Sequence, residues 1–177
     1  MSTRESLCLF AAVTLVASAA AAADTPKFGK PISEADAAAW DISIGPDGVG
    51  LPAGSGTPQQ GATVYAAKCA ACHGAKGEGG AGPRLVGGQG TLRAPTPPVQ
   101  TVGSYWPYAT TVFDYVRRTM PWDKPKTLTN DEVYAVTAYI LNMNGIVKEG
   151  EAMNKDTLPK VRMPNRDGFT ELYPNKF

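Results

Sequence analysis

This chain of 177 residues has few histidines and cysteines and almost no net charge. It contains one His and three Cys, and its 17 basic and 16 acidic residues leave a net charge of +1. A nucleic-acid-binding protein normally shows a basic surface, so the charge balance argues against one. Three cysteines, one of them close to the N-terminus, do not suit a disulfide framework. The composition fits one globular domain of ordinary size with peripheral segments.

Long hydrophobic runs are also missing, and the one apolar stretch of note lies at the N-terminus. Arg4 precedes an apolar core from Leu7 to Val16, and small residues fill positions 17–23 before Asp24. At roughly 16 residues the stretch is short for a membrane span. Its three parts are those of a secretory signal peptide, with a retained membrane anchor as the alternative. We therefore predict cleavage after residue 23, export to the periplasm and no membrane span in the mature protein.

The rest of the chain divides into an N-terminal extension (24–57), a helical domain (58–146) and a C-terminal tail (147–177). In the extension, Ser33 is positioned to cap a short helix that runs to Trp40. A segment rich in glycine and proline follows it and predicts loop structure. Four apolar residues of the extension are expected to pack against a neighbouring surface: Trp40, Ile42, Ile44 and Leu51. The tail is polar and is expected to lie over the surface of the domain.

Three helices are predicted in the domain, which makes the fold class all-α. The first runs from Gln59 into Cys69, and the second covers 108–119 and is stopped by Pro121. The third begins at a capping box in which Thr129 is followed three residues later by Glu132. It ends before Gly145, a typical residue for the end of a helix.

The first helix leads into Cys69-Ala70-Ala71-Cys72-His73, a Cys-x-x-Cys-His motif. This is the signature of covalent c-type haem attachment. Two thiols about one helical turn apart can add to the two vinyl groups on one edge of the porphyrin. The histidine beside the second thiol can then ligate the iron. We predict one covalent haem c, attached at Cys69 and Cys72 and ligated by His73.

A Cys-x-x-Cys pair has three other uses in proteins. A dithiol redox site does not need the histidine and normally follows a strand. A structural zinc site needs four ligands, whereas the mature chain offers only three of the usual Cys and His type. A disulfide would leave the histidine unexplained. Haem attachment accounts for every residue of the motif.

The sixth ligand of the iron decides whether the protein carries electrons or binds small molecules. No second histidine exists, so methionine is the natural partner, and His/Met ligation raises the reduction potential. Four methionines follow the leader: Met120, Met143, Met153 and Met163. Met120 is preferred because it lies just past a helix and before Pro121, and Met163, which also precedes a proline, is its competitor. A sensor or catalyst with an open sixth position is the alternative of a different class.

This order of elements resembles the class I cytochrome c fold. Gly82-Pro83-Arg84-Leu85 is similar to the Gly-Pro-x-Leu segment of that family. The resemblance implies that the Pro83 carbonyl accepts the ring N–H of His73 and orients it. It also implies that the first helix crosses the last one, with Gly61 and Tyr65 near Tyr139.

A narrower resemblance concerns cytochromes of bacterial sulfur oxidation. The similar segments are 40–42, 51–56, 102–118 with Met120-Pro121, and 163–169. Those relatives are haem subunits of sulfite dehydrogenases and of a related sulfur dehydrogenase, in which a molybdenum subunit oxidises the substrate. The subunit of the thiosulfate pathway resembles a two-haem protein, whereas this chain has a single attachment motif. The departure favours the sulfite dehydrogenase type or a free carrier.

The resemblance implies that Tyr105 and Trp106 line the haem pocket or bond a haem propionate. Arg117 and Arg118 are candidates for a propionate or a partner. The alternative for all four is ordinary packing with solvated charges. The predicted function is electron transfer from a molybdenum sulfite dehydrogenase to a downstream cytochrome or oxidase. The alternative is a general soluble carrier that serves a terminal oxidase or a thiosulfate-oxidation system.

Overall fold

The computed structural model describes residues 28–170. The predicted signal peptide (1–23) therefore lies outside the described residues, as do the ends of the extension and of the tail. The described part separates into two units, 28–39 and 40–170. Residues 40–57, which the sequence analysis placed in the extension, are thus part of the unit that carries the Cys-x-x-Cys-His motif. Within 28–170, no helix is both long enough and apolar enough to cross a membrane.

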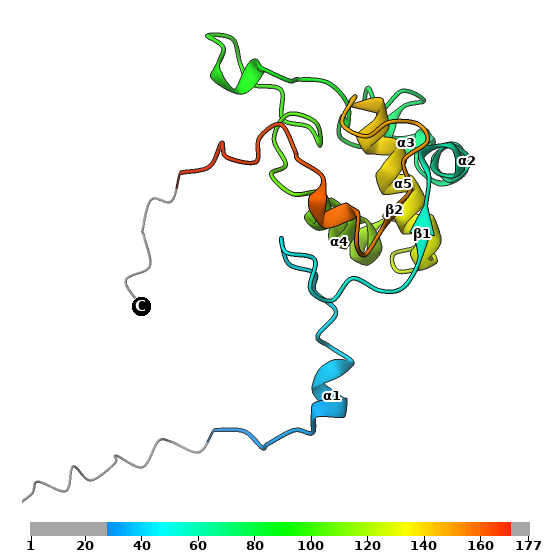
Figure 1. Ribbon diagram of the computed structural model, residues 1–177, viewed down its shortest axis with the longest axis vertical. Coiled ribbons are helices and arrows are strands. Elements are labelled where there is room, and N and C mark those ends of the chain that lie inside the picture. Colours follow the sequence, from blue (N-terminus) through cyan, green and yellow to red (C-terminus); the bar gives the residue numbers. More distant parts are fainter. Residues whose placement is uncertain (1–27, 171–177) are drawn as a thin grey trace, which may run out of the picture. The chain divides into compact units, whose positions relative to one another are not determined.

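The described residues are helical with very little strand, as expected for an all-α fold (Figure 1). The elements in chain order are α1 (Glu34–Ala38), β1 (Ser55–Gly56), α2 (Pro58–Lys68), α3 (Ala70–His73), η1 (Thr91–Arg93), α4 (Ala109–Thr119), α5 (Asn130–Met143), β2 (Met153–Asn154) and η2 (Leu158–Lys160). The two strands pair antiparallel. The class I cytochrome c fold that the sequence predicted agrees with this architecture.

The helix starts follow from local capping. Ser33 caps α1, and Thr129 and Glu132 form the predicted capping box of α5. Helix α2 begins one residue before the predicted Gln59. Its cap is Thr57, which is bonded reciprocally to Gln60, and Pro58 occupies the first helical position, where no N–H is needed.

Helices α2 and α5 cross at a contact that only glycine permits. A Cβ atom on Gly61 would lie 1.9 Å from the Ala135 carbonyl oxygen and 2.7 Å from Tyr139 Cβ. Beside the contact, the rings of Tyr65 and Tyr139 pack with centroids 5.4 Å apart. The crossing implied by the resemblance is therefore present.

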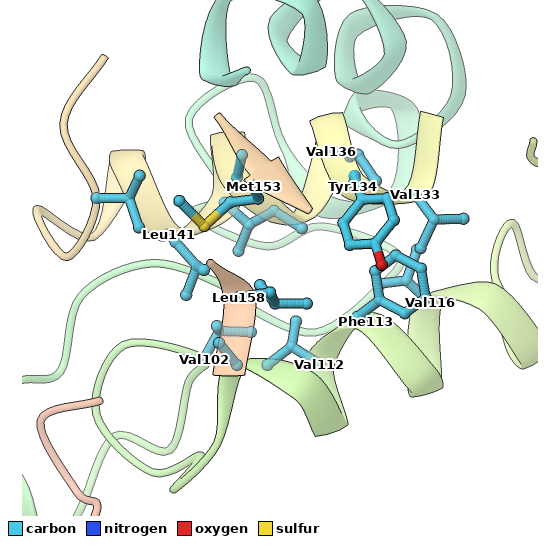
Figure 2. Close-up of a cluster of buried hydrophobic side chains, with 14 of the residues drawn as sticks. Val102, Val112, Phe113, Val116, Val133, Tyr134, Val136, Leu141, Met153 and Leu158 are labelled. Atoms are coloured by element: carbon cyan, nitrogen blue, oxygen red, sulfur yellow. The ribbon is translucent and has the colours of Figure 1, made fainter. Parts of the chain in front are cut away.

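The core lies between α4, α5 and parts of the tail (Figure 2). Phe113 of α4 packs on Tyr134 of α5, with ring centroids 4.4 Å apart. The tail is more than a surface cover, because Met153, Leu158 and Met163 are at most 4% exposed and belong to this core. Their spacing follows no helical or strand period, which is why the tail was predicted to be peripheral.

Only part of the packing predicted for the extension is correct. Ile44 is 4% exposed and lies in the core, and Leu51 packs against it. Trp40 is 85% exposed, so its predicted burial is wrong. The Ile44 N–H donates to the carboxylate of the buried Asp114 at 3.1 Å, a partner seventy positions away that no local pattern announces.

Replacing Gly61 by alanine is expected to destabilise the protein by about 3 kcal/mol, because the new methyl group forces two backbones apart. The measurement is the free energy of unfolding in denaturant. Gly150→Ala is the matched control, since nothing lies within 4 Å of its Cβ position. Equal stability of the two variants would show that α2 and α5 do not meet at Gly61.

The ion pair between Lys68 Nζ and Glu132 Oε1, 2.6 Å apart, is expected to give a pH-dependent stabilisation. The hydrogen bond from Lys68, together with that from the Thr129 N–H, lowers the pKa of Glu132. A carboxyl group whose pKa is lowered by folding stabilises the folded state at pH values above its unfolded-state pKa. This stabilisation is lost as the pH falls through its folded-state pKa. Lys68→Ala should therefore cost about 0.5 kcal/mol at neutral pH and nothing in strong acid.

The control for this pair is Lys155→Ala. Lys155 and Asp156 also form an ion pair, but their side chains are 59% and 67% exposed. Lys155 also lowers the pKa of Asp156, but solvent screens this exposed pair, so Lys155→Ala should cost less than Lys68→Ala at neutral pH. A cost for Lys68→Ala that persists in strong acid would contradict the electrostatic explanation.

Candidate haem-attachment site

The Cys-x-x-Cys-His motif spans the end of α2 and the whole of α3. Cys69 caps α2 through its N–H, which donates to the Tyr65 carbonyl at 2.9 Å. The Cys69 carbonyl in turn accepts from the N–H groups of Cys72 and His73, at 3.1 and 3.0 Å. The two thiols are therefore carried on a single helical turn, as attachment to one edge of a porphyrin requires.

The ring of His73 is oriented by the loop that follows the motif. Its Nδ1 lies 2.7 Å from the Pro83 carbonyl oxygen, so the contact that the resemblance implied is present. Since a carbonyl can only accept, Nδ1 is the donor in this contact, and Nε2 is the nitrogen left to ligate a metal. The approach depends on Gly82, where a Cβ would lie 3.0 Å from His73 Cε1.

Tyr65 ties the end of the motif back to α2, a role that the sequence analysis missed. Its hydroxyl donates to the Gly74 carbonyl at 2.9 Å, directly after His73. Burial raises the pKa of Tyr65 to about 12, so the hydroxyl remains a donor at any physiological pH. An aromatic residue on the predicted crossing face was the only available signal, and it indicated packing alone.

Cys69 does not have the lowered pKa of a reactive thiol. Burial raises the pKa of the Cys69 thiol to about 11, and the nearby Lys68 offsets this only in part. A dithiol redox site needs a thiol whose pKa is lowered. Both Cys69 and Cys72 are free cysteines, and Cys72 is exposed. Within residues 28–170, no three His, Cys, Asp or Glu side chains come together as a metal site.

The four methionines fall into two environments. Met153 and Met163 are 4% and 1% exposed and are core residues. Met120 and Met143 are partly buried and pack against the outside of the same core. Met120 ends α4, and its N–H donates to the Val116 carbonyl at 3.0 Å. A partly buried thioether at a helix end is more available as a ligand than one surrounded by core side chains, and this holds for Met120 and Met143 alike. Met120 stays the predicted ligand on its sequence context, just past a helix and before Pro121.

Tyr105 and Trp106 each pack against another aromatic ring. Tyr105, 37% exposed, meets the edge of Phe169 at a centroid distance of 5.3 Å. Trp106 meets Tyr115 of α4 in the same manner at 5.6 Å. Their contact with a haem stays a prediction.

The two arginines of α4 have protein partners. Arg118 Nε lies 3.0 and 3.1 Å from the two carboxylate oxygens of Asp114, whose side chain is 10% exposed. Arg117 donates to the Ile42 carbonyl at 3.5 Å. Arg118 therefore neutralises the buried carboxylate of Asp114. This pairing explains the positive charge at position 118 without a haem propionate.

The residues present fit a covalent haem c. Two thiols on one helical turn can hold the porphyrin edge, and an imidazole with a free Nε2 can ligate iron. Several apolar side chains that are only partly buried pack against the core, among them Leu85, Trp106, Met120 and Tyr139. Such side chains offer the apolar surface that a macrocycle needs.

The chain was compared with known proteins. A sequence profile of the family described as cytochrome c matches residues 58–144. Among solved structures, a chain of the sulfane dehydrogenase SoxCD from Paracoccus pantotrophus is similar, with 41% sequence identity and a TM-score of 0.75. The match covers 86% of this chain and 73% of the SoxCD chain. A search of curated proteins found no match.

Replacing Met120 by alanine is expected to remove the weak long-wavelength band of a methionine-ligated ferric haem. The reduction potential should fall by more than about 100 mV, because the axial ligand sets it. Absorption spectroscopy and redox titration of the purified haem protein test this. Met163→Leu is the control: it should keep spectrum and potential and lose up to about 1.5 kcal/mol of stability. The reverse result would identify Met163 as the ligand.

Proposed function

The chain belongs to the cytochrome c family, as a class I c-type cytochrome related to enzymes of sulfur oxidation, and from this we propose that it is a periplasmic single-haem protein that accepts electrons from a molybdenum-containing sulfite dehydrogenase. Membership of this family indicates electron transfer rather than catalysis. When bound, haem c supplies one-electron chemistry between its ferric and ferrous states.

The protein's own residues supply attachment, orientation and tuning. Cys69 and Cys72 hold the group on one helical turn, so it cannot dissociate between electron transfers. The Pro83 carbonyl fixes the proton on Nδ1 of His73 and thereby presents Nε2. The Met120 thioether favours the reduced state and raises the potential. None of these roles requires a substrate to be bound or released, which suits an electron carrier.

The observation that carries the choice of donor is the likeness to the SoxCD chain. At 41% identity it covers 86% of this chain, more than the residues matched to the cytochrome c family. A donor that oxidises a sulfur compound is therefore preferred over a general dehydrogenase. The single attachment motif favours a sulfite-oxidising donor, or a free carrier, over the thiosulfate-pathway subunit, because that related subunit resembles a two-haem protein.

A second candidate is the haem partner of a sulfane dehydrogenase. The SoxCD match itself favours it, since that protein is a sulfane dehydrogenase. In both candidates the acceptor is a downstream cytochrome or oxidase. Export rests on residues 1–23, whose three-part layout is that of a signal peptide.

The test follows the haem absorbance of the protein isolated gently from its native source. Sulfite should reduce the haem rapidly, and the reduction should be lost when a co-purifying molybdenum protein is removed and restored when it is added back. Ascorbate, which needs no enzyme, is the control for a competent haem. An unrelated single-haem cytochrome c of similar potential, mixed with the same fraction, controls for indiscriminate reduction.

Three results would count against the proposal. Reduction by ascorbate but not by sulfite would exclude the sulfite donor. Reduction by a sulfane substrate in place of sulfite would favour the second candidate. Equal reduction of the unrelated cytochrome would favour a general carrier over a dedicated partner.

A further inference from the structure

Residues 163–169, which we call the strap, lie against the segment that carries the predicted haem-pocket aromatics. The strap starts at Met163, which is 1% exposed and anchored in the core. It lies beyond residue 144, where the match to the cytochrome c family ends. Its contacts hold residues 105–108 in place.

Three interactions of different kinds join the strap to residues 105–108. Asn165 Nδ2 donates to the Tyr105 carbonyl at 2.7 Å. The guanidinium carbon of Arg166 lies 4.1 Å from the centroid of the Tyr108 ring, a cation–π contact. Phe169 packs edge-on against the Tyr105 ring. The strap therefore holds both the backbone and the side chains of this segment.

The held segment leads to the end of α4. Trp106 packs against Tyr115 with ring centroids 5.6 Å apart. The Tyr115 carbonyl accepts from the Thr119 hydroxyl at 2.7 Å, and the Val116 carbonyl accepts from the Met120 N–H at 3.0 Å. One ring contact thus joins Trp106, which lies between the two held tyrosines, to the last turns of the helix that ends at Met120.

We propose that Asn165 and Arg166 are positioning residues that hold the Met120 sulfur at the iron. The proposal rests on the proposed function and on Met120 as the axial ligand. A thioether is a weak ligand for ferric iron, so its retention depends on how firmly the protein places it. With the strap released, states in which the sulfur is displaced become more populated, and an external ligand selects them.

The experiment uses the full-length ferric haem protein and imidazole, which competes with the thioether for the iron. The double variant Asn165→Ala/Arg166→Ala is expected to bind imidazole about tenfold more tightly, since one hydrogen bond and one cation–π contact are lost. Arg166→Lys alone should bind as the unsubstituted protein does, because an ammonium group keeps the cation–π contact.

Arg162→Ala is the matched control on the same stretch of chain. Arg162 pairs with Asp167, but the two side chains are 77% and 73% exposed, so the pair contributes little. Its imidazole affinity should equal that of the unsubstituted protein. Tighter binding in this variant would mean that any change in the tail has the effect, and the proposal would be overturned.

Hydrogen exchange supplies a readout that does not involve the iron. The Tyr105 N–H donates to the Thr101 carbonyl at 2.9 Å, and its exchange should be about tenfold faster in the double variant. Faster exchange with unchanged imidazole affinity would overturn the positioning role, because the segment would move without moving the sulfur. Unchanged exchange would overturn the role of the strap itself.

Met120→Ala distinguishes a failure of the strap proposal from a failure of the Met120 ligand assignment. If it abolishes the methionine band while the double variant behaves like the unsubstituted protein, only the strap proposal fails. If it leaves the band intact, the ligand assignment is wrong and both fail. We expect Met120→Ala to lose the methionine band. We expect the double variant to keep the band, with a thioether that competes less well against imidazole.

Discussion

The attachment motif is positioned by the packing of α2 against α5, and the two helices approach most closely at Gly61. At Gly61 the surface of α2 meets the Ala135 carbonyl of α5 so closely that no side chain fits between them. The ring contact of Tyr65 with Tyr139 and the ion pair of Lys68 with Glu132 join the same two helices, and Cys69 follows directly after α2. The position of the attachment motif therefore depends in part on Gly61, because no larger residue fits at this contact.

Much of the fold could be predicted because its signals are local. Ser33 and Thr129 mark helix starts through hydrogen bonds to residues three positions away, which a sequence displays directly. The contacts between distant segments carry no such signal. Ile44 is buried and bonded to a carboxylate on α4, whereas Trp40 is exposed, and nothing in the extension itself distinguishes the two residues.

The candidate site divides in the same way. The Cys-x-x-Cys-His motif states its chemistry in five consecutive residues, and the partner of His73 followed from a family resemblance. Sequence context favoured Met120 over Met163, because Met120 lies just past a helix, although both residues precede a proline. Their burial separates them: one lies at a helix end and the other deep in the core. Arg118 was ambiguous until its pairing with Asp114 was seen.

The short ladder between β1 and β2 has a consequence for where this protein can be divided. Ser55 pairs with Asn154 and Gly56 with Met153, so a segment that precedes α2 is hydrogen-bonded to one that follows α5. The chain is clasped on itself outside both ends of the region matched to the family, 58–144. The cooperative folding unit is consequently larger than the module that sequence similarity outlines. Neither flank can be trimmed alone without leaving an unpaired strand edge on the other.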